Sequence, residues 1–353
     1  IMCNINEIYR LDFTSNLNTD NPIVLSVLPI HHTFELTVDN LGVLNCGATI
    51  CINDKMENIL ANMQRFKPHV ILVVPAIAEV FYKKLKEAMS KGKEKRLVAI
   101  AKTASKALDV MHIDARRSLY KKVIGRLGGN ITNIVVGGAA LRPEVANFFA
   151  EFGICMIQGY GLTECAPLVA ANCPSVNRIG SVGKPVSFLE TKLKDGEIIV
   201  KGPGVMLGYY KNEDATKEVI DADGWLHTGD MGVMDPDGTI YIKGRCKTMI
   251  LTGAGQNIYP EEIEDKLNNL PLVLESLIVE RKGVLTALIV PDYDQAKVEN
   301  VSREDVDKMM AENIKNLNTM VASYEKIGRY ELMESEFEKT PKRSIKRFLY
   351  QDK

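Results

Sequence analysis

The sequence predicts an α/β protein in which a parallel sheet with helices is followed by a small barrel-like β subdomain and an α+β C-terminal domain. Three observations predict it. Apolar runs alternate with stretches of helical spacing over the first half of the chain, short β runs separated by glycine and proline follow, and strands and a helix share the last third. We expect these three parts to span residues 1–170, 171–245 and 246–353.

The composition is that of a globular protein with a sizeable core. The chain has 353 residues, 46% of them hydrophobic, and a net charge of −1, which predicts a soluble protein of two or three domains. No apolar run reaches the roughly 18 residues that span a bilayer. The seven cysteines show no CxxC pairing, so we expect reduced thiols and a cytoplasmic location. Because the chain begins at Ile1, we expect the natural protein to begin upstream.

Strand-like and helical stretches alternate along the first third of the chain. Residues 23–28 have the composition of a strand, 56–66 show helical apolar spacing, and 70–74 are fully apolar, as in a parallel sheet. A helix is expected from Ala76 to about Lys91. This alternation indicates a doubly wound sheet. The basic stretch 92–129 could meet nucleic acid or anionic lipid, but its interleaved apolar residues favour an amphipathic helix pair with a solvated face. We therefore expect no nucleic-acid partner.

Residues 29–35 follow the first predicted strand and contain two histidines and an aromatic residue. Such side chains could line a pocket at the end of the strand. Adjacent histidines on a regular element point apart, so we expect no metal pair at His31 and His32. Helix capping or plain packing is the alternative reading.

Two stretches of small residues follow predicted strands in the middle of the chain. Residues 131–136 precede Gly137-Gly138-Ala139, and 153–157 precede a turn predicted over Gln158-Gly159-Tyr160-Gly161-Leu162-Thr163-Glu164. Ligands of open α/β sheets bind at the carboxyl ends of strands, and glycine permits unusual torsions and a close approach of a ligand to the backbone. Two such loops side by side suit a nucleotide, with Thr163 offering a hydroxyl to phosphate and Glu164 an oxygen to a divalent cation. Ordinary turns with solvated polar residues are the alternative.

The later part of the chain changes to short strands and turns. Asp230 follows a glycine and could accept hydrogen bonds from the two hydroxyls of a ribose. An aspartate in a common β-turn is the alternative. The remaining expected elements are β runs at 180–185, 197–202 and 206–210, a hairpin turn at 235–238, two short strands within 272–290 and a helix at 302–317.

Four motifs occur in the order and spacing of one enzyme family. They are Tyr160-Gly-Leu-Thr-Glu164, Gly224-Trp-Leu-His-Thr-Gly-Asp230, Gly244-Arg245-x-Lys247 and Gly255-x-Asn257-Ile-x-Pro260-x-Glu262-Ile-Glu264. The chain therefore resembles the adenylate-forming enzymes, and among them an acyl-CoA synthetase. Residues 28–35 look like the corresponding segment of long-chain fatty acid–CoA ligases.

The resemblance implies a two-step reaction that uses ATP, Mg²⁺ and coenzyme A. A carboxylate first reacts with ATP to give an acyl-adenylate and pyrophosphate, and the acyl group then passes to the thiol of coenzyme A. It also implies that the C-terminal part rotates between the two steps about a hinge at Lys247. For the nucleotide, the resemblance implies that Thr163 contacts a phosphate, that Glu164 binds magnesium, that Asp230 and Arg245 hold the ribose, and that the adenine is contacted by Gly137, Gly138, Ala139, Gln158, Gly159 and Tyr160, with Gly161 in the same nucleotide-binding stretch. For the acyl group, it implies that His32, beside Phe34, faces the acyl and thioester site. For coenzyme A, it implies a pantetheine tunnel lined by Gly253, Gly255 and Asn257.

The chain departs from the family pattern at two places. The phosphate-binding loop of the family, rich in serine, threonine and glycine, would precede residue 1, so we expect the chain by itself not to adenylate. Near the C-terminus, Ser344 stands where the family has a catalytic lysine. Lys342 or Lys346 could take its place from a shifted register, and a basic solvated tail is the alternative.

Taken together, the sequence favours ligation of a medium- or long-chain fatty acid to coenzyme A, within fatty acid metabolism. The partners expected from the resemblance are the fatty acid, ATP and coenzyme A. Two alternatives stay open, an acyl-AMP ligase that delivers to a carrier protein and a non-catalytic relative that binds nucleotide or acyl groups. The resemblance also leaves open a peripheral membrane association and a homodimer for the whole protein.

Overall fold

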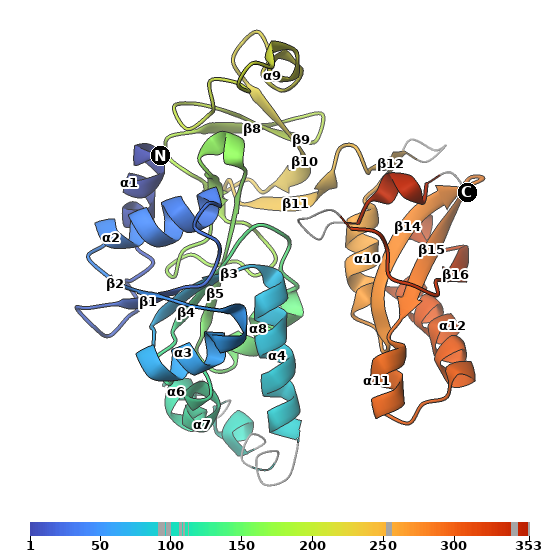
Figure 1. Ribbon diagram of the computed structural model, residues 1–353, viewed down its shortest axis with the longest axis horizontal. Helices are drawn as coiled ribbons and strands as arrows, with labels where there is room; N and C mark the ends of the chain where they lie inside the picture. Colours follow the sequence, from blue (N-terminus) through green and yellow to red (C-terminus); the bar gives the residue numbers. More distant parts are fainter. Residues whose placement is uncertain are drawn as a thin grey trace. The chain divides into compact units, whose positions relative to one another are not determined.

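The computed structural model describes residues 1–90, 96, 100–105, 108, 110–111, 113–251, 256–339 and 345–351. The chain divides into two compact units, the first made of 1–228 with 232–242 and the second of 229–231 with 243–353 (Figure 1). The predicted site residues Gly253, Gly255 and Lys342, and the unusual Ser344, lie outside the described residues. Each unit is described by itself below.

A seven-stranded sheet forms the centre of the first unit, with strand order β2-β1-β3-β4-β5-β6-β7. The first five strands in this order run parallel to one another, whereas β6 runs antiparallel to both β5 and β7. The predicted parallel sheet is thus confirmed. The bounds are β1 Ile23–Ser26, β2 Thr49–Ile52, β3 Val70–Val73, β4 Asn133–Val136, β5 Cys155–Gly161, β6 Leu168–Ala171 and β7 Lys184–Pro185.

Helices cover both faces of this sheet, which explains why the central strand β3 is apolar throughout. In β3, Ile71 and Val73 pack into one core cluster and Val70 and Leu72 into another. The first cluster holds α3, α4 and α8, and the second holds α1 and the π-helix η1 (Figure 1). Strands buried on both faces lose the polar alternation of an exposed sheet. The bounds are α1 Met2–Leu11, η1 Phe34–Gly42, α2 Val43–Asn45, η2 Met56–Asn58, α3 Ile59–Phe66, α4 Pro75–Ser90, α6 Arg116–Leu119, α7 Lys121–Gly125, α8 Pro143–Ala150 and η3 Thr163–Cys165.

The β-rich part contributes a four-stranded sheet of order β11-β10-β9-β8 and the helix α9 (Glu213–Val219). The hairpin predicted at 235–238 is confirmed, since Asp235 N–H donates to the carbonyl of Thr239 and Gly238 adopts a φ of 88°. The β run predicted at 206–210 is wrong, because this stretch is irregular. The strands are β8 Glu190–Lys194, β9 Glu197–Lys201, β10 Leu226–Met234 and β11 Ile240–Arg245.

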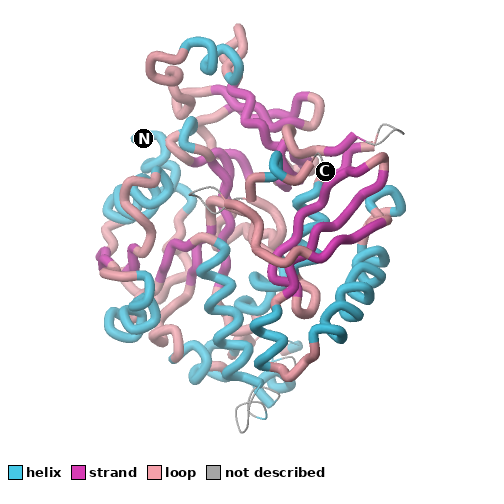
Figure 2. Tube along the Cα trace, turned by 45° about the vertical axis from the view of Figure 1, so that its right-hand side comes forward, coloured by secondary structure: helices cyan, strands magenta, loops and turns pink. Residues whose placement is uncertain are grey.

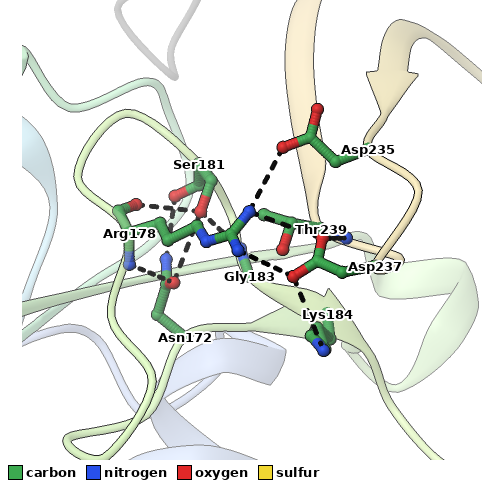
Figure 3. Close-up of polar contacts among 8 residues, drawn as sticks. All are labelled: Asn172, Arg178, Ser181, Gly183, Lys184, Asp235, Asp237 and Thr239. Atoms are coloured by element: carbon green, nitrogen blue, oxygen red, sulfur yellow. Dashed lines mark hydrogen bonds and ion pairs between the residues drawn. The ribbon is translucent and has the colours of Figure 1, made fainter.

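An ion-pair network ties the loop before β7 to the β10–β11 hairpin (Figure 3). The Arg178 guanidinium lies 3.2 Å from a carboxylate oxygen of Asp235 and 2.8 Å from one of Asp237. Behind it, the buried Asn172 accepts from the backbone N–H of Arg178 and from the hydroxyl of Ser181. The loop is therefore fixed from both sides, by charge at the surface and by amide hydrogen bonds underneath.

The second unit is built on a three-stranded sheet in which β14 and β15 are antiparallel and β15 and β16 are parallel. Helices α10 and α12 bury their apolar sides in one core with this sheet, and the Ser302 hydroxyl caps α12 by accepting from the N–H of Asp305. The predicted strands and helix are confirmed, and both strands are longer than expected. The bounds are β12 Ile250–Leu251, β13 Asn257–Ile258, α10 Pro260–Asn268, β14 Val273–Arg281, β15 Val284–Pro291, α11 Tyr293–Val298, α12 Arg303–Met320, η4 Ser323–Glu325, β16 Arg329–Leu332 and η5 Arg347–Leu349.

Both units contain helices as well as strands (Figure 2). Among the described residues, no helix has the length and apolar composition needed to cross a membrane. The same residues contain no group of three or more histidine, cysteine, aspartate or glutamate side chains that could hold a metal ion by itself.

Candidate active site

The parallel strands of the first unit end at one edge of the sheet, where three of the predicted segments meet. Val73, Val136 and Gln158 are direct neighbours across β3, β4 and β5. The segments that leave the sheet here are residues 27–34 after β1, Gly137 to Ala139 after β4, and the end of β5 with η3. This edge is where open α/β sheets bind ligands.

The turn predicted over 158–164 is wrong, because β5 continues to Gly161. Its last residues pair antiparallel with β6, so that Gly159 faces Ala171 and Gly161 faces Leu168. Neither glycine adopts a positive φ. A partner strand that arrives later in the sequence supplies the hydrogen bonds that keep this glycine-rich stretch extended.

Gly161 is nevertheless required, for a different reason than the predicted torsion. An ideal Cβ at this position would lie 2.1 Å from the carbonyl oxygen of Pro167, so only glycine lets the two backbones come this close. The chain then enters η3, which carries the exposed Thr163 and the half-buried Glu164. The close approach therefore fixes where these two polar side chains emerge.

The Gly137 loop accommodates a flat ring, but the ring belongs to the protein. A Cβ on Gly137 would lie 3.1 to 3.4 Å from ring atoms of Phe34. Gly138 has a φ of 86° and is exposed with Ala139. The predicted space against Gly137 is thus filled by Phe34, and Gly138 and Ala139 are left facing solvent.

Glu164 has a partner that the sequence did not reveal. The phenol of Tyr209 donates to Glu164 Oε1 at 2.8 Å. This hydrogen bond raises the pKa of Tyr209 above its ordinary value, with smaller contributions from burial and from the charge of Glu164. Tyr209 lies in the stretch 206–210 that the pattern predicts as a strand. No spacing marks it as a site residue, since it meets Glu164 only through the fold.

Asp230 and Arg245 form an ion pair in the second unit. Arg245 Nη1 lies 2.6 Å from Asp230 Oδ1, and the side chains are 58% and 11% exposed. The exposed guanidinium of Arg245 thus covers the buried carboxylate of Asp230, and the N–H groups of a guanidinium can donate to two oxygen atoms at once. Gly229, before Asp230, has a φ of 70° within β10. The arrangement can bind a vicinal diol.

The other predicted site residues are scattered. His31 and His32 are exposed, and their ring centroids are 4.5 Å apart, so the expectation that they point apart is wrong. They lie in a turn, where the geometry of a regular element does not apply. Lys247 is exposed in the turn after β11, and Asn257 is exposed in β13. Lys346 Nζ lies 3.3 Å from a carboxylate oxygen of Glu338.

Residues 2–210 match the sequence profile of the AMP-binding enzymes, and residues 247–352 match that of the AMP-binding enzyme C-terminal domain. The chain belongs to the AMP-binding enzyme family. This AMP-binding enzyme is 31% identical to the long-chain-fatty-acid–CoA ligase FadD15 of Mycobacterium bovis, over 94% of the chain and 60% of that protein. It is 32% identical to the mouse long-chain-fatty-acid–CoA ligase 5, over 78% of the chain and 43% of that protein. The chain thus spans about 60% or less of the length of these relatives.

Solved structures share the fold of this AMP-binding enzyme. ATP-bound MatB from Rhodopseudomonas palustris superimposes with a TM-score of 0.69 at 22% identity, over 99% of the chain and 63% of MatB. O-succinylbenzoate coenzyme A synthetase (MenE) from Bacillus subtilis, in complex with AMP, gives 0.68 at 22% identity, over 99% of the chain and 65% of that protein. The predicted large parallel-sheet domain and smaller C-terminal domain are thereby confirmed.

Proposed function

We propose that the protein ligates a medium- or long-chain fatty acid to coenzyme A through an acyl-adenylate. The observation that carries the proposal is the placement of the Gly137–Ala139 loop beside Gln158 at the carboxyl edge of the parallel sheet, with Glu164 in η3 directly after the same strand β5, in a chain whose relatives are named long-chain fatty-acid ligases. Bound ATP would supply the adenylyl group that activates the acid, with pyrophosphate as the leaving group, and Mg²⁺ would balance the charge of the phosphates.

The residues present fit these groups. Glu164 is half-buried and offers carboxylate oxygens, the ligand type that Mg²⁺ prefers. The Tyr209 hydroxyl restrains this carboxylate before any cation arrives. Asp230 and Arg245 would hold the ribose hydroxyls, while Gly138, Ala139 and Gln158 to Gly161 would line the nucleotide. His32 would face the acyl group, and either Lys342 or Lys346 would take the place of the catalytic lysine in adenylation.

Three further expectations stay proposals. We propose the domains 1–170, 171–245 and 246–353, with Lys247 at the hinge and Gly253, Gly255 and Asn257 toward coenzyme A. We also propose a cytoplasmic location, which the seven free thiols support. A peripheral membrane association and a homodimer of the whole protein remain predictions that call for sedimentation with and without lipid vesicles.

Delivery to a carrier protein is a second candidate function. It is favoured by a relative named long-chain-fatty-acid–[acyl-carrier-protein] ligase AEE15 of Arabidopsis thaliana, which is 28% identical over 77% of the chain and 46% of that protein. Supplying the whole protein with either coenzyme A or acyl-carrier protein separates the two functions, since only the true acceptor gives a thioester.

ATP–pyrophosphate exchange by the whole protein, measured with a panel of fatty acids, tests the first step. We expect acid-dependent exchange that falls about a hundredfold in Glu164→Gln, because an electrostatic contact to the reacting phosphates is lost. Glu151→Gln, which alters an exposed surface carboxylate, serves as the matched control. If both variants catalyse ATP–pyrophosphate exchange equally well, Glu164 does not take part in adenylation.

Ser344→Lys tests the non-catalytic alternative in the same assay. Exchange by the unaltered protein means that another lysine serves adenylation. Exchange that appears only in Ser344→Lys would show that the natural protein has lost its first step and would refute the proposed ligase activity.

A further inference from the structure

Two buried carboxyl groups lie beside the candidate site, in the π-helix η1. Glu35 and Asp39 are four positions apart, and both are 0% exposed. Glu35 Oε1 accepts from the hydroxyl of Ser26 at 2.5 Å and from the backbone N–H of Leu28 at 3.2 Å. The other oxygen of Glu35 and both oxygens of Asp39 have no hydrogen-bond partner within the described part of the chain. Ionised groups in such surroundings are strongly disfavoured.

Within the described residues, no ion pair neutralises these two carboxyl groups. The elements that pack most extensively against η1 are α1, α2 and β1. Strands β3, β4 and β5 belong to the same core cluster; β3 and β4 contain no ionisable side chain, and β5 contains the thiol of Cys155 and the phenol of Tyr160. Neither α2 nor β1 contains an ionisable side chain, and Cys46, just after α2, is a half-buried thiol. The ionisable residues of α1 are Cys3, Glu7, Tyr9 and Arg10. Arg10 is the only cation among them, and it lies against Glu7 and Ser187.

A protonated form of the pair is accordingly favoured over two ionised carboxylates. Burial, followed by the charge of Glu35, raises the pKa of Asp39 to about 9, and burial raises the pKa of Glu35 as well. A cation bound by the pair is the alternative, but a hard cation takes six or more oxygen ligands. The described residues offer no group of three metal-ligating side chains here.

We propose that Glu35 and Asp39 share one proton, with the Asp39 carboxyl group donating to the Glu35 carboxylate, and that they act as positioning residues for residues 27–34. The proton comes from water, and no covalent bond changes. A single shared proton leaves one negative charge on the pair, which the Ser26 hydroxyl and the Leu28 N–H stabilise through Glu35 Oε1.

The shared proton would hold the loop between β1 and η1. Glu35 joins the end of β1 to the start of η1, and His31 and His32 lie between these two anchor points. Phe34, next to Glu35, has its ring against Gly137 at the edge of the sheet. A second negative charge on the pair would loosen this anchor. That the loop serves acyl transfer rests on the proposed function, whereas the proton sharing does not.

The first test is a pH titration of stability on the chain itself. The sign follows from the raised pKa of Asp39, since the folded state keeps a proton that the unfolded state releases above its ordinary pKa of 3.8. The stabilisation is complete below that value and is lost as the pH rises through about 9. Each retained proton makes the unfolding equilibrium constant rise tenfold per pH unit in this window. We expect Asp39→Asn to lose one such tenfold dependence, and an unchanged dependence overturns the proposal.

The second test observes the proton and the loop directly. Infrared difference spectra at neutral pH should contain the carbonyl band of a protonated carboxyl group that disappears in Asp39→Asn and persists in Glu151→Gln. Amide exchange of Leu28 should speed up at least tenfold in Glu35→Ala and return to its original rate in Glu35→Gln, which still offers an acceptor oxygen. Absence of the carboxyl band, or unchanged exchange in Glu35→Ala, overturns the proposal. Neither measurement needs nucleotide or acid, so the outcome is separate from that of the ligase activity.

Discussion

The two glycines of β5 should respond in opposite ways to the same substitution. An ideal Cβ on Gly161 lies 2.1 Å from the carbonyl oxygen of Pro167 and 2.8 Å from its carbonyl carbon. The nearest atom to a Cβ on Gly159 is the carbonyl oxygen of Ala170 at 3.6 Å, an ordinary contact. We therefore expect Gly161→Ala to destabilise the protein and Gly159→Ala to be tolerated.

The magnitudes follow from what each methyl group displaces. In Gly161→Ala the chain must shift away from Pro167, which breaks the hydrogen bond from Leu162 N–H to the Pro167 carbonyl, 2.9 Å long. Overpacking costs about 1–3 kcal/mol and a lost hydrogen bond about 0.5–1.5 kcal/mol, so we expect a loss of about 2–4 kcal/mol in the free energy of unfolding. Gly159→Ala should gain about 0.5–1 kcal/mol, because glycine in a strand loses more backbone entropy than alanine on folding.

Equilibrium urea unfolding measures both effects. Trp225 is the only tryptophan of the chain and lies in the first unit, so its fluorescence reports the unfolding of that unit. We expect the urea midpoint to fall in Gly161→Ala and to rise slightly in Gly159→Ala, with an unchanged slope. If the two variants differ by less than about 0.5 kcal/mol, the close backbone approach does not decide the tolerance and the reasoning is refuted.

Two further predictions concern charged groups. Arg347 forms an ion pair with the buried Glu264, and burial raises the pKa of Glu264 from its ordinary value of 4.5 to about 7. The contribution of this carboxyl group to stability is therefore lost as the pH rises through about 7. Arg347→Ala should therefore lower the free energy of unfolding by about 3–5 kcal/mol at about pH 8 and by clearly less at about pH 5, where Glu264 is protonated. The control Arg329→Ala, at an exposed position, should show no such difference between the two pH values. Unfolding curves followed by circular dichroism measure both variants. Glu164→Gln should lower the pKa of Tyr209 toward its ordinary value, as followed by NMR of ring-labelled tyrosine; an unchanged pKa of Tyr209 would contradict the hydrogen bond.

Local pattern was sufficient for the central sheet. Both faces of the strand Val70–Val73 pack against helices, so all four of its residues are apolar. An unbroken apolar run of this length is visible in the sequence and predicts a strand buried on both faces. The helix α8 begins with Pro143, a position where its missing N–H costs nothing. Such elements are specified by their own residues, and the strand predicted at 70–74 was confirmed.

The errors lie where a distant segment decides the local structure. Gly159 and Gly161 suggest a turn, but β6 holds them in a strand. Tyr209 reaches Glu164 across 45 positions, which no spacing rule anticipates. No prediction was made for Asp39, whose burial depends on the packing of α1 over η1. Pairing and burial are properties of the assembled fold.

The double role of β5 bears on the entropy of ligand binding. Residues up to Gln158 pair with β4 and those from Gly159 to Gly161 pair with β6, so sheet hydrogen bonds hold β5 along its whole length, first to one partner strand and then to the other. A segment held in this way has little conformational freedom left to lose when a ligand arrives, and more of each contact's energy appears as affinity. Binding here should thus leave the slow amide exchange of β5 almost unaltered, while side chains such as Thr163 adjust.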